Sequence, residues 1–294
     1  MNLTVLSDGS ERIRYQNPAI PIYTVMGELQ ELTNMAALCH WHEDIEILLP
    51  VEGYLFYNVN GQQVFIAQGN AIVVNARHMH YGYSNDGSNC RYACITFRPQ
   101  LLCANEEIKK RFVTPVLTNS GFQYLLLEQN NRAHQSLLMI VNQLIEGFSK
   151  HEMWKLGKLY EFWQELLPLS EKTESEATDT DTEILKRMLE FIRLHCSERI
   201  SLAQIAASGG ICRSKCCRVF NKYLNCTPNV YLNSLRLEKA MELLRATEMT
   251  VTEIAFSCGF NSASYFAESF VKEKGCTPKE YRKKGKRDSC ASFS

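Results

Sequence analysis

Two histidines and a glutamate lie close together near residue 40 of this 294-residue chain, as His40, His42 and Glu46. In an extended strand side chains alternate between two faces, so His40 and His42 would share one face. Imidazole nitrogens and carboxylate oxygens are ligands of divalent metal ions, and the same groups form hydrogen bonds with polar small molecules. The spacing therefore indicates a metal site, a polar pocket for a small effector, or structural histidines that are paired within the protein.

A second group of polar side chains, between residues 213 and 221, has the pattern of a helix that binds a polyanion. At helical spacing its buried face would consist of Cys216, Val219, Phe220 and Tyr223. The opposite, groove-facing side would carry Arg213, Ser214, Lys215, Cys217, Arg218 and Asn221.

The net charge of zero conceals an acidic half and a basic half. Residues 1–182 carry 13 Lys and Arg against 21 Asp and Glu, and residues 183–294 carry 19 against 11. The resulting charges are −8 and +8, so the second half is the one expected to bind nucleic acid.

The basic half contains an internal repeat. The matching positions, 49 or 50 residues apart, are Ile205-Ala206 with Ile254-Ala255, Gly210 with Gly259, Phe220 with Phe270, Cys226-Thr227-Pro228 with Cys276-Thr277-Pro278, and Tyr231 with Tyr281. A small Ala lets two helices cross closely, and a Gly four residues later permits the tight turn of a helix-turn-helix. Capping boxes begin at Ser201, Thr250 and Thr277. The repeat predicts helix-turn-helix units at about 201–221 and 250–271, joined by a helix over 228–245.

The acidic half changes its hydrophobic period along the chain. Residues 20–98 read as short strands, with Asn60-Gly61 as a hairpin turn, and residues 134–167 have the apolar spacing of amphipathic helices. Residues 168–182 contain six Ser or Thr and five Asp or Glu, which is typical of a linker. We therefore expect an α+β protein with a first domain at 1–167, a linker at 168–182 and an all-α domain at 183–294.

The composition, with 45% apolar and 22% charged residues, is typical of a globular protein. No run approaches the roughly 18 apolar residues of a membrane helix, and no signal peptide is recognisable, so we expect a cytoplasmic protein without a membrane partner. The 12 cysteines form no CxxC pair, which favours free thiols over a structural zinc site.

Residues 185–284 resemble the DNA-binding domain of the AraC/XylS transcription regulators. The resemblance rests on Ile254-Ala255, Gly259-Phe260, Ser264-Tyr265-Phe266, Phe270 and the Gly-Cys-Thr-Pro-Lys-Glu-Tyr-Arg run at 275–282. It implies that the two units enter adjacent major grooves. The positions that it turns toward DNA are Ser214, Cys217 and Arg218 in the first recognition helix and Ser262, Ala263, Ser264, Ala267 and Glu268 in the second.

The second recognition helix departs from the family pattern. Glu268 and Val271 stand where members commonly carry Arg or Lys. A carboxylate repels phosphates but can accept a hydrogen bond from cytosine N4. We therefore expect the first helix to dominate affinity and the second to bind weakly or selectively.

The first domain resembles the cupin-like sensor domain of the same family. Gly53 follows Glu46 by seven residues, and His80 follows Gly69 by eleven, which is the spacing of the two cupin motifs. The resemblance implies an antiparallel β-barrel in which His40, His42, Glu46 and His80 converge, as they do on a divalent ion in metal-containing cupins. Asn75 and Arg77 replace the usual Pro and Gly of the second motif. The helices at 134–167 would mediate homodimerisation.

These observations predict a sequence-specific transcription regulator, an activator that responds to a sugar or related metabolite at the four polar residues. Its partners would be double-stranded promoter DNA, the effector, a second copy of the chain and RNA polymerase, and no resident cofactor is required. The alternative is a cupin-type metalloenzyme with an accessory helical domain. A third interpretation, thiol catalysis at Cys212, Cys216 and Cys217, is disfavoured because Cys216 would point into the core.

Overall fold

A computed structural model describes residues 5, 10–171, 180–224 and 226–283. The chain divides into two compact units, Met1–Thr182 and Glu183–Ser294. Residues 172–179 of the predicted linker and Cys290 lie outside the described residues. None of the described helices combines the length and apolar composition that a bilayer crossing requires.

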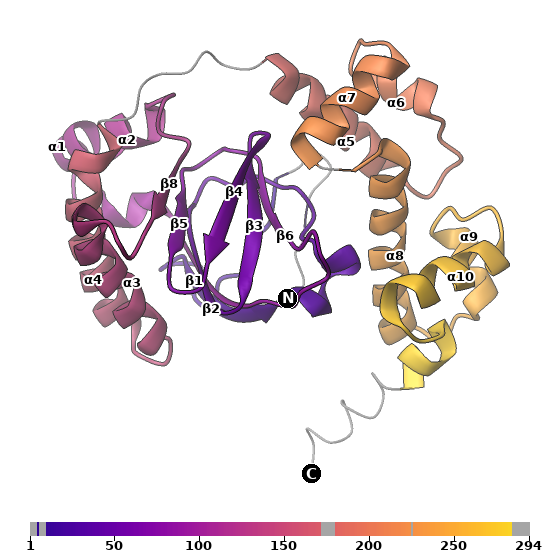
Figure 1. Ribbon diagram of the computed structural model, residues 1–294, viewed down its shortest axis with the longest axis horizontal. Coiled ribbons are helices and arrows are strands. Elements are labelled where there is room, and N and C mark those ends of the chain that lie inside the picture. Colours follow the sequence, from indigo (N-terminus) through magenta and orange to yellow (C-terminus); the bar gives the residue numbers. More distant parts are fainter. Residues whose placement is uncertain (1–4, 6–9, 172–179, 225, 284–294) are drawn as a thin grey trace. The chain divides into compact units, whose positions relative to one another are not determined.

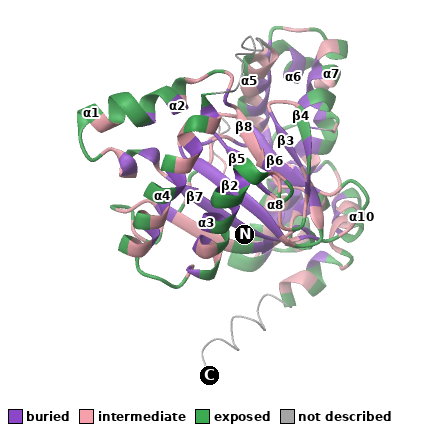
Figure 2. Ribbon diagram, turned by 60° about the vertical axis from the view of Figure 1, so that its left-hand side comes forward, coloured by how far each residue is buried: buried purple, intermediate pink, exposed green. Residues whose placement is uncertain are grey.

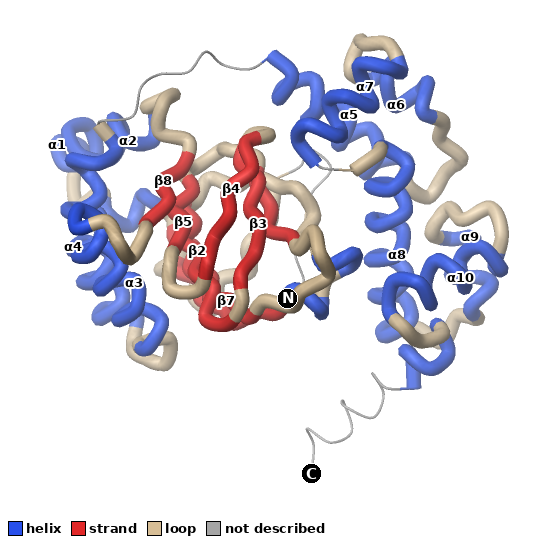
Figure 3. The backbone as a smooth tube through the Cα atoms, in the orientation of Figure 1, coloured by secondary structure: helices blue, strands red, loops and turns tan. Residues whose placement is uncertain are grey.

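The first unit contains two antiparallel sheets, of order β1-β7-β2-β5-β8 and β4-β3-β6 (Figures 1 and 3). Their strands are β1 (Ile22–Glu28), β2 (Ile45–Glu52), β3 (Tyr54–Val59), β4 (Gln62–Ala67), β5 (Ala71–Val74), β6 (His80–Tyr83), β7 (Arg91–Phe97) and β8 (Tyr124–Leu127). The predicted hairpin turn is confirmed between β3 and β4, where Asn60 and Gly61 have φ values of 47° and 86°. Positive φ at both positions is what a two-residue hairpin turn of this type requires.

No ladder joins the two sheets within the described residues, so closure of the barrel expected from the sequence is not detected. Strand β2 pairs with β5 only over Glu46–Leu48. Pro50 accepts a hydrogen bond from the N–H of Gly69 but has no N–H to return, so regular pairing ends there. The α+β class and the β-rich first unit are confirmed.

Strand β2 separates two apolar layers of the first unit. Ile45 and Ile47 belong to a core cluster with residues of the long helices, whereas Leu48 belongs to a cluster with the smaller sheet. By strand alternation Glu46 shares the face of Leu48 and points into the space between the sheets. Buried residues therefore fill both sides of β2, β5 and β7 (Figure 2).

Helices cover the outer face of the larger sheet. They are α1 (Glu106–Ile108), α2 (Thr114–Thr118), α3 (Gln135–Glu146) and α4 (Glu152–Ser170), with 3₁₀ turns at Leu29–Glu31, Thr33–Met35, Pro99–Leu102 and Arg132–His134 and a π turn at Lys109–Val113. Helix α4 extends to Ser170, and the first helix of the next unit begins at Thr180. Both ends of the predicted 168–182 linker are thus helical, and Ser170, the last residue of α4, is buried.

The second unit is all helical in its described residues. Its helices are α5 (Thr180–His195), α6 (Leu202–Ser208), α7 (Arg213–Leu224), α8 (Pro228–Ala246), α9 (Val251–Ser257) and α10 (Ala263–Lys274). Helix α8 joins the pair α6–α7 to the pair α9–α10 (Figure 1). The predicted capping boxes at Ser201 and Thr250 are confirmed, and the same reciprocal hydrogen bonds join Thr277 and Glu280.

Candidate functional site

Backbone hydrogen bonds bring the two histidine segments of the first unit together. His40 and His80 form an isolated bridge, in which the His40 N–H donates to the His80 carbonyl at 3.2 Å and the reverse bond measures 2.8 Å. The Arg77 N–H donates to the His42 carbonyl at 2.7 Å. Because Glu46 enters from β2, pairing between distant segments rather than sequence proximity completes the site.

The structure brings all four predicted site residues of the first unit together. They are His40, His42, Glu46 and His80, hereafter the buried cluster, and one ligand atom of each lies within 4.8 Å of the others. Each residue is at most 5% exposed. Glu46 Oε2 lies 3.4 Å from His42 Nε2 and 3.6 Å from His80 Nε2.

The backbone fixes which nitrogen of each imidazole faces the centre. Nδ1 of His40, His42 and His80 contacts the carbonyl oxygens of residues 38, 44 and 78 at 2.7, 3.0 and 2.8 Å. A carbonyl oxygen only accepts, so Nδ1 carries the proton and Nε2 of a neutral ring presents its lone pair. Nε2 of His40 and of His80 is buried without a hydrogen bond in the described part of the chain.

Burial and neighbouring groups set the charges of the buried cluster. Burial, together with the imidazoles of His80 and His42, holds the pKa of His40 well below its usual 6.5. Burial opposes ionisation of Glu46, but His80 and His42 outweigh it and hold the pKa of Glu46 well below 4.5. The Tyr57 hydroxyl donates to the other carboxylate oxygen, Glu46 Oε1. The cluster therefore combines an ionised carboxylate with three imidazole rings, of which His40 is neutral.

This donor set fits the divalent metal ion that the cupin resemblance implies. Nitrogen and oxygen ligands lie about 2.0–2.2 Å from such an ion, so neighbouring ligand atoms are about 3.0–3.4 Å apart. The contacts from Glu46 Oε2, 3.4 and 3.6 Å, are close to that range. Two orphaned imidazole nitrogens in the same space are the observation that favours a cation over a purely structural role for the histidines.

The two departures from the second cupin motif lie outside the buried cluster. Asn75 Nδ2 donates to the carbonyls of Val116 and Phe122, so it ties down a loop. Arg77 has a φ of 69°, in the left-handed region that favours glycine, and its guanidinium pairs with Glu43. The turn that the motif needs is therefore kept without the glycine.

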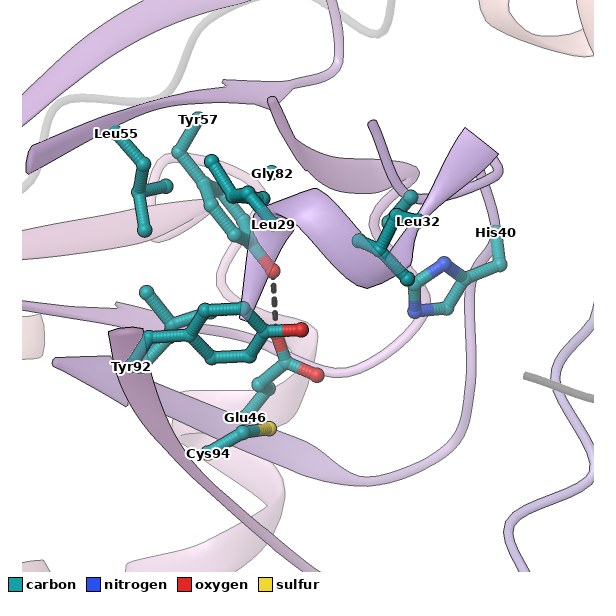
Figure 4. Close-up of a pocket in the computed structure, with 11 residues that line it drawn as sticks. Leu29, Leu32, His40, Glu46, Leu55, Tyr57, Gly82, Tyr92 and Cys94 are labelled. Atoms are coloured by element: carbon teal, nitrogen blue, oxygen red, sulfur yellow. Dashed lines mark hydrogen bonds between the residues drawn. The ribbon is translucent and has the colours of Figure 1, made fainter. Parts of the chain in front are cut away.

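A small cavity adjoins the buried cluster (Figure 4). Its walls are Leu29, Leu32, Ala37, His40, Glu46, Leu48, Leu55, Tyr57, Gly82, Tyr92 and Cys94. The space that a water-sized sphere can enter is about 30 Å³, whereas one water needs at least about 10–15 Å³ on the same measure. The cavity as it stands has room for an ion with one or two waters, and a sugar would need it to widen.

One residue of this site was missed by the sequence analysis. Glu11 Oε2 lies 3.5 Å from His40 Nε2, and the Glu11 side chain is only 9% exposed. Burial and the nearby carboxylate of Glu46 raise the pKa of Glu11 to about 8. No motif includes residue 11, and no spacing in the sequence relates it to His40.

In the second unit, α7 has the two faces that the sequence predicts. Its inner residues Cys216, Val219, Phe220 and Tyr223 are buried. On the outer face Arg213, Ser214, Arg218 and Asn221 are exposed, and Lys215 and Cys217 are partly exposed. The exposed face therefore carries the cations that a DNA backbone would attract.

Helix α10 has a similar interior and a different exterior. Phe266 and Phe270 are buried, and the Ser262 side chain caps the helix by accepting from the Tyr265 N–H. Among the remaining candidates Ser264 and Glu268 are exposed, and Ala263 and Ala267 are partly exposed. Tyr265, which the sequence analysis did not single out as a contact, lies in the first turn of α10 and is 50% exposed.

Comparisons with known proteins match both units. Residues 30–152 match the AraC-like ligand binding domain, and residues 205–284 match a family described as a helix-turn-helix domain. The HTH-type transcriptional regulator YdeC of Bacillus subtilis (strain 168) is 29% identical over 287 residues, which cover 96% of this chain and 98% of that protein.

Two further relatives extend the comparison. The HTH-type transcriptional activator RhaS of Enterobacter sp. (strain 638) is 27% identical and covers 83% of this chain and 86% of its own. The melibiose operon regulatory protein of Escherichia coli (strain K12) is 23% identical and covers 83% of each chain. These relatives are transcription regulators and not enzymes, which removes the support for a metalloenzyme.

Proposed function

Because the chain belongs to the AraC family of transcription regulators, we propose that it activates a promoter in response to a small-molecule effector such as a sugar or related metabolite. In this chain the match to the ligand-binding domain precedes the match to the helix-turn-helix domain. The names of two relatives, a transcriptional activator and a regulator of the melibiose operon, support activation and a sugar-like effector. We assign effector sensing to residues 1–167 and DNA binding to residues 183–294.

The observation that carries the proposal is the pair of helices with buried phenylalanines and exposed polar faces. Phe220 of α7 and Phe270 of α10 are both 0% exposed, which fixes each helix by one side only. The opposite side of each helix is free to contact base edges in a major groove. We propose that α7 supplies most of the affinity through Arg213, Lys215 and Arg218, and that α10 reads bases selectively through Glu268.

The effector is proposed to bind at the buried cluster and the adjoining cavity. Imidazole and carboxylate groups recognise hydroxyl oxygens, and the leucine side chains supply apolar walls. A divalent ion held by the cluster would supply a Lewis-acid anchor for an effector oxygen. The effector must bind two states of the regulator with different affinity, since otherwise it shifts no equilibrium.

A second copy of the chain and RNA polymerase are the proposed protein partners. Helices α3 and α4 expose apolar side chains, with Met139 58%, Met153 72% and Tyr160 41% exposed. Exposed apolar residues on neighbouring helices are typical of a dimer surface. Sedimentation that finds only monomer at micromolar concentration would contradict the dimer.

Selection of bound sequences from random duplex DNA tests the central proposal. We expect full-length protein to enrich two short motifs about one helical turn, roughly 10 base pairs, apart. Recovery of no common sequence would contradict it. Thermal unfolding with candidate sugars then tests the effector, and a true effector should stabilise wild-type protein and Glu43→Gln but not His42→Ala.

A further inference from the structure

Glu11 lies beside the buried cluster, and contacts of Glu11 itself and of the residues before and after it hold it there. Its N–H donates to the Trp41 carbonyl at 2.8 Å, and Ser10 forms a bridge with Trp41. Four residues later the Tyr15 hydroxyl donates to Asp44 Oδ1 at 2.6 Å. The segment is thus fixed along residues 41–44, and this attachment directs the Glu11 carboxylate toward His40.

With Glu11 ionised, as it would be when it binds a cation, the contact between Glu11 and His40 joins two acceptors. Nδ1 of His40 contacts the Leu38 carbonyl at 2.7 Å and so carries the proton, which leaves a lone pair on Nε2. Glu11 Oε2 faces that nitrogen at 3.5 Å. Two buried acceptors oppose each other unless a positively charged species lies between them. The same is true of Nε2 of His80, which lies 3.6 Å from Glu46 Oε2.

The separations across the site agree with ligands of one ion. Carboxylate oxygens lie 3.4, 3.5 and 3.6 Å from the nearest imidazole nitrogens. Neighbouring ligands of one ion are about 3.0–3.4 Å apart, and each of these three contacts is close to that separation. We propose that Glu11, outside both histidine segments, is the fifth protein ligand of a divalent transition-metal ion in the buried cluster.

The donor set defines the class of metal. Three imidazoles and two carboxylates suit ions such as Zn²⁺, Co²⁺, Ni²⁺, Fe²⁺ or Mn²⁺, whereas Mg²⁺ and Ca²⁺ prefer oxygen ligands throughout. Two carboxylates also balance the charge of a divalent ion in a site without solvent access. This inference rests on the proposed function in one respect, since it takes the buried cluster to be the ligand site. It does not depend on DNA binding.

Binding of Co²⁺ to chelator-treated full-length protein tests the proposal, because Co²⁺ reports its ligands by visible absorption. We expect wild-type protein to bind one Co²⁺ per chain, and Glu11→Gln to bind it about 10- to 100-fold more weakly. Loss of a ligand should also alter the absorption spectrum of the bound ion. Four-coordinate Co²⁺ absorbs more strongly than five- or six-coordinate Co²⁺.

Matched variants separate ligation from folding and from general electrostatics. Glu43→Gln removes a carboxylate three residues from Glu46 whose partner is the exposed Arg77, so its Co²⁺ affinity and spectrum should equal those of wild type. His42→Ala should abolish binding. Glu11→Asp should restore part of the affinity that Glu11→Gln loses, because the ligand type returns on a shorter side chain. Circular dichroism of each metal-free variant shows whether it is folded.

Two results would overturn the proposal. One is a wild-type protein that binds no Co²⁺, Zn²⁺ or Ni²⁺, since a proton shared by Glu11 and His40 would then explain their contact. The other is a folded Glu11→Gln variant with the affinity and spectrum of Glu43→Gln. Sequence-specific DNA binding in either case would leave the proposed function standing, so the two failures are distinguishable.

Discussion

The turns of the two helix-turn-helix copies use the same backbone hydrogen bond. In the first copy the Ile211 N–H donates to the Ala206 carbonyl at 3.1 Å, and in the second the Phe260 N–H donates to the Ala255 carbonyl at 3.0 Å. The turn glycines both have positive φ, 69° at residue 210 and 87° at residue 259.

The outer faces of the two copies differ as much as their turns agree. Helix α7 carries Arg213, Lys215 and Arg218, whereas α10 exposes Glu268 and Val271. Packing restricts the interior of each copy to residues that fit a close-packed core, which are mainly apolar, whereas the exposed face is not restricted in this way. The difference teaches that stability should depend on equivalent positions in both copies, while DNA affinity should depend mainly on the first.

The largest expected effect tests the equivalence of the two interiors. Phe220→Ala and Phe270→Ala each remove a fully buried ring, and each should lower the free energy of unfolding by about 3–5 kcal/mol. Urea denaturation followed by helical circular dichroism measures it. Phe256→Ala, at a side chain 54% exposed, is the control and should stay within about 0.5 kcal/mol of wild type. A large loss at only one of the two buried positions would break the equivalence.

Replacing each turn glycine with alanine should cost different amounts of stability, although both glycines have the same left-handed conformation. A Cβ at Gly210 would meet nothing within 4 Å, whereas a Cβ at Gly259 would lie 2.4 Å from the Cys196 carbonyl oxygen. Gly210→Ala should lower the free energy of unfolding by about 1–2 kcal/mol, because alanine is strained in the left-handed conformation. Gly259→Ala should lower it further, because the backbone at Cys196 must also move. Equal unfolding midpoints for the two variants would show that the segment at Cys196 yields freely.

Base recognition provides the third test. Arg218→Ala should weaken binding to the selected operator by about 1–3 kcal/mol and relax one base position. Glu268→Ala should leave overall affinity unchanged or raised, because it removes a charge that repels phosphates, while any preference for cytosine at its position is lost. Gel-shift titrations on matched operators measure both. A greater loss with Glu268→Ala than with Arg218→Ala would reverse the assigned roles.

The smallest effect concerns phosphate contacts. Arg213→Ala should reduce the slope of log affinity against log salt by about 1, and Val271→Lys should increase it by about 1. Titrations at several salt concentrations with operator and unrelated DNA measure the slopes. An unchanged slope for Val271→Lys would mean that this end of α10 does not approach the backbone.

Local sequence rules predicted the second unit closely. The caps at Ser201 and Thr250, the turn glycines and the buried phenylalanines all follow from interactions within four or five residues along a helix. The same holds for the Asn60-Gly61 hairpin, where two residues determine the turn. The boundary of a linker depends on packing that composition alone does not reveal, and both ends of the predicted linker are helical.

The first unit shows what the sequence alone leaves open. Residue types and motif spacing predicted that His40, His42, Glu46 and His80 converge, and the repeat predicted helices α7 and α10. Only the tertiary structure decided that two sheets form without a shared ladder among the described residues, that Arg77 takes the glycine conformation, and that Glu11 reaches His40. The physical reason is range: helix caps and hairpin turns depend on neighbours in the chain, whereas a contact between segments far apart depends on the packing of everything between them.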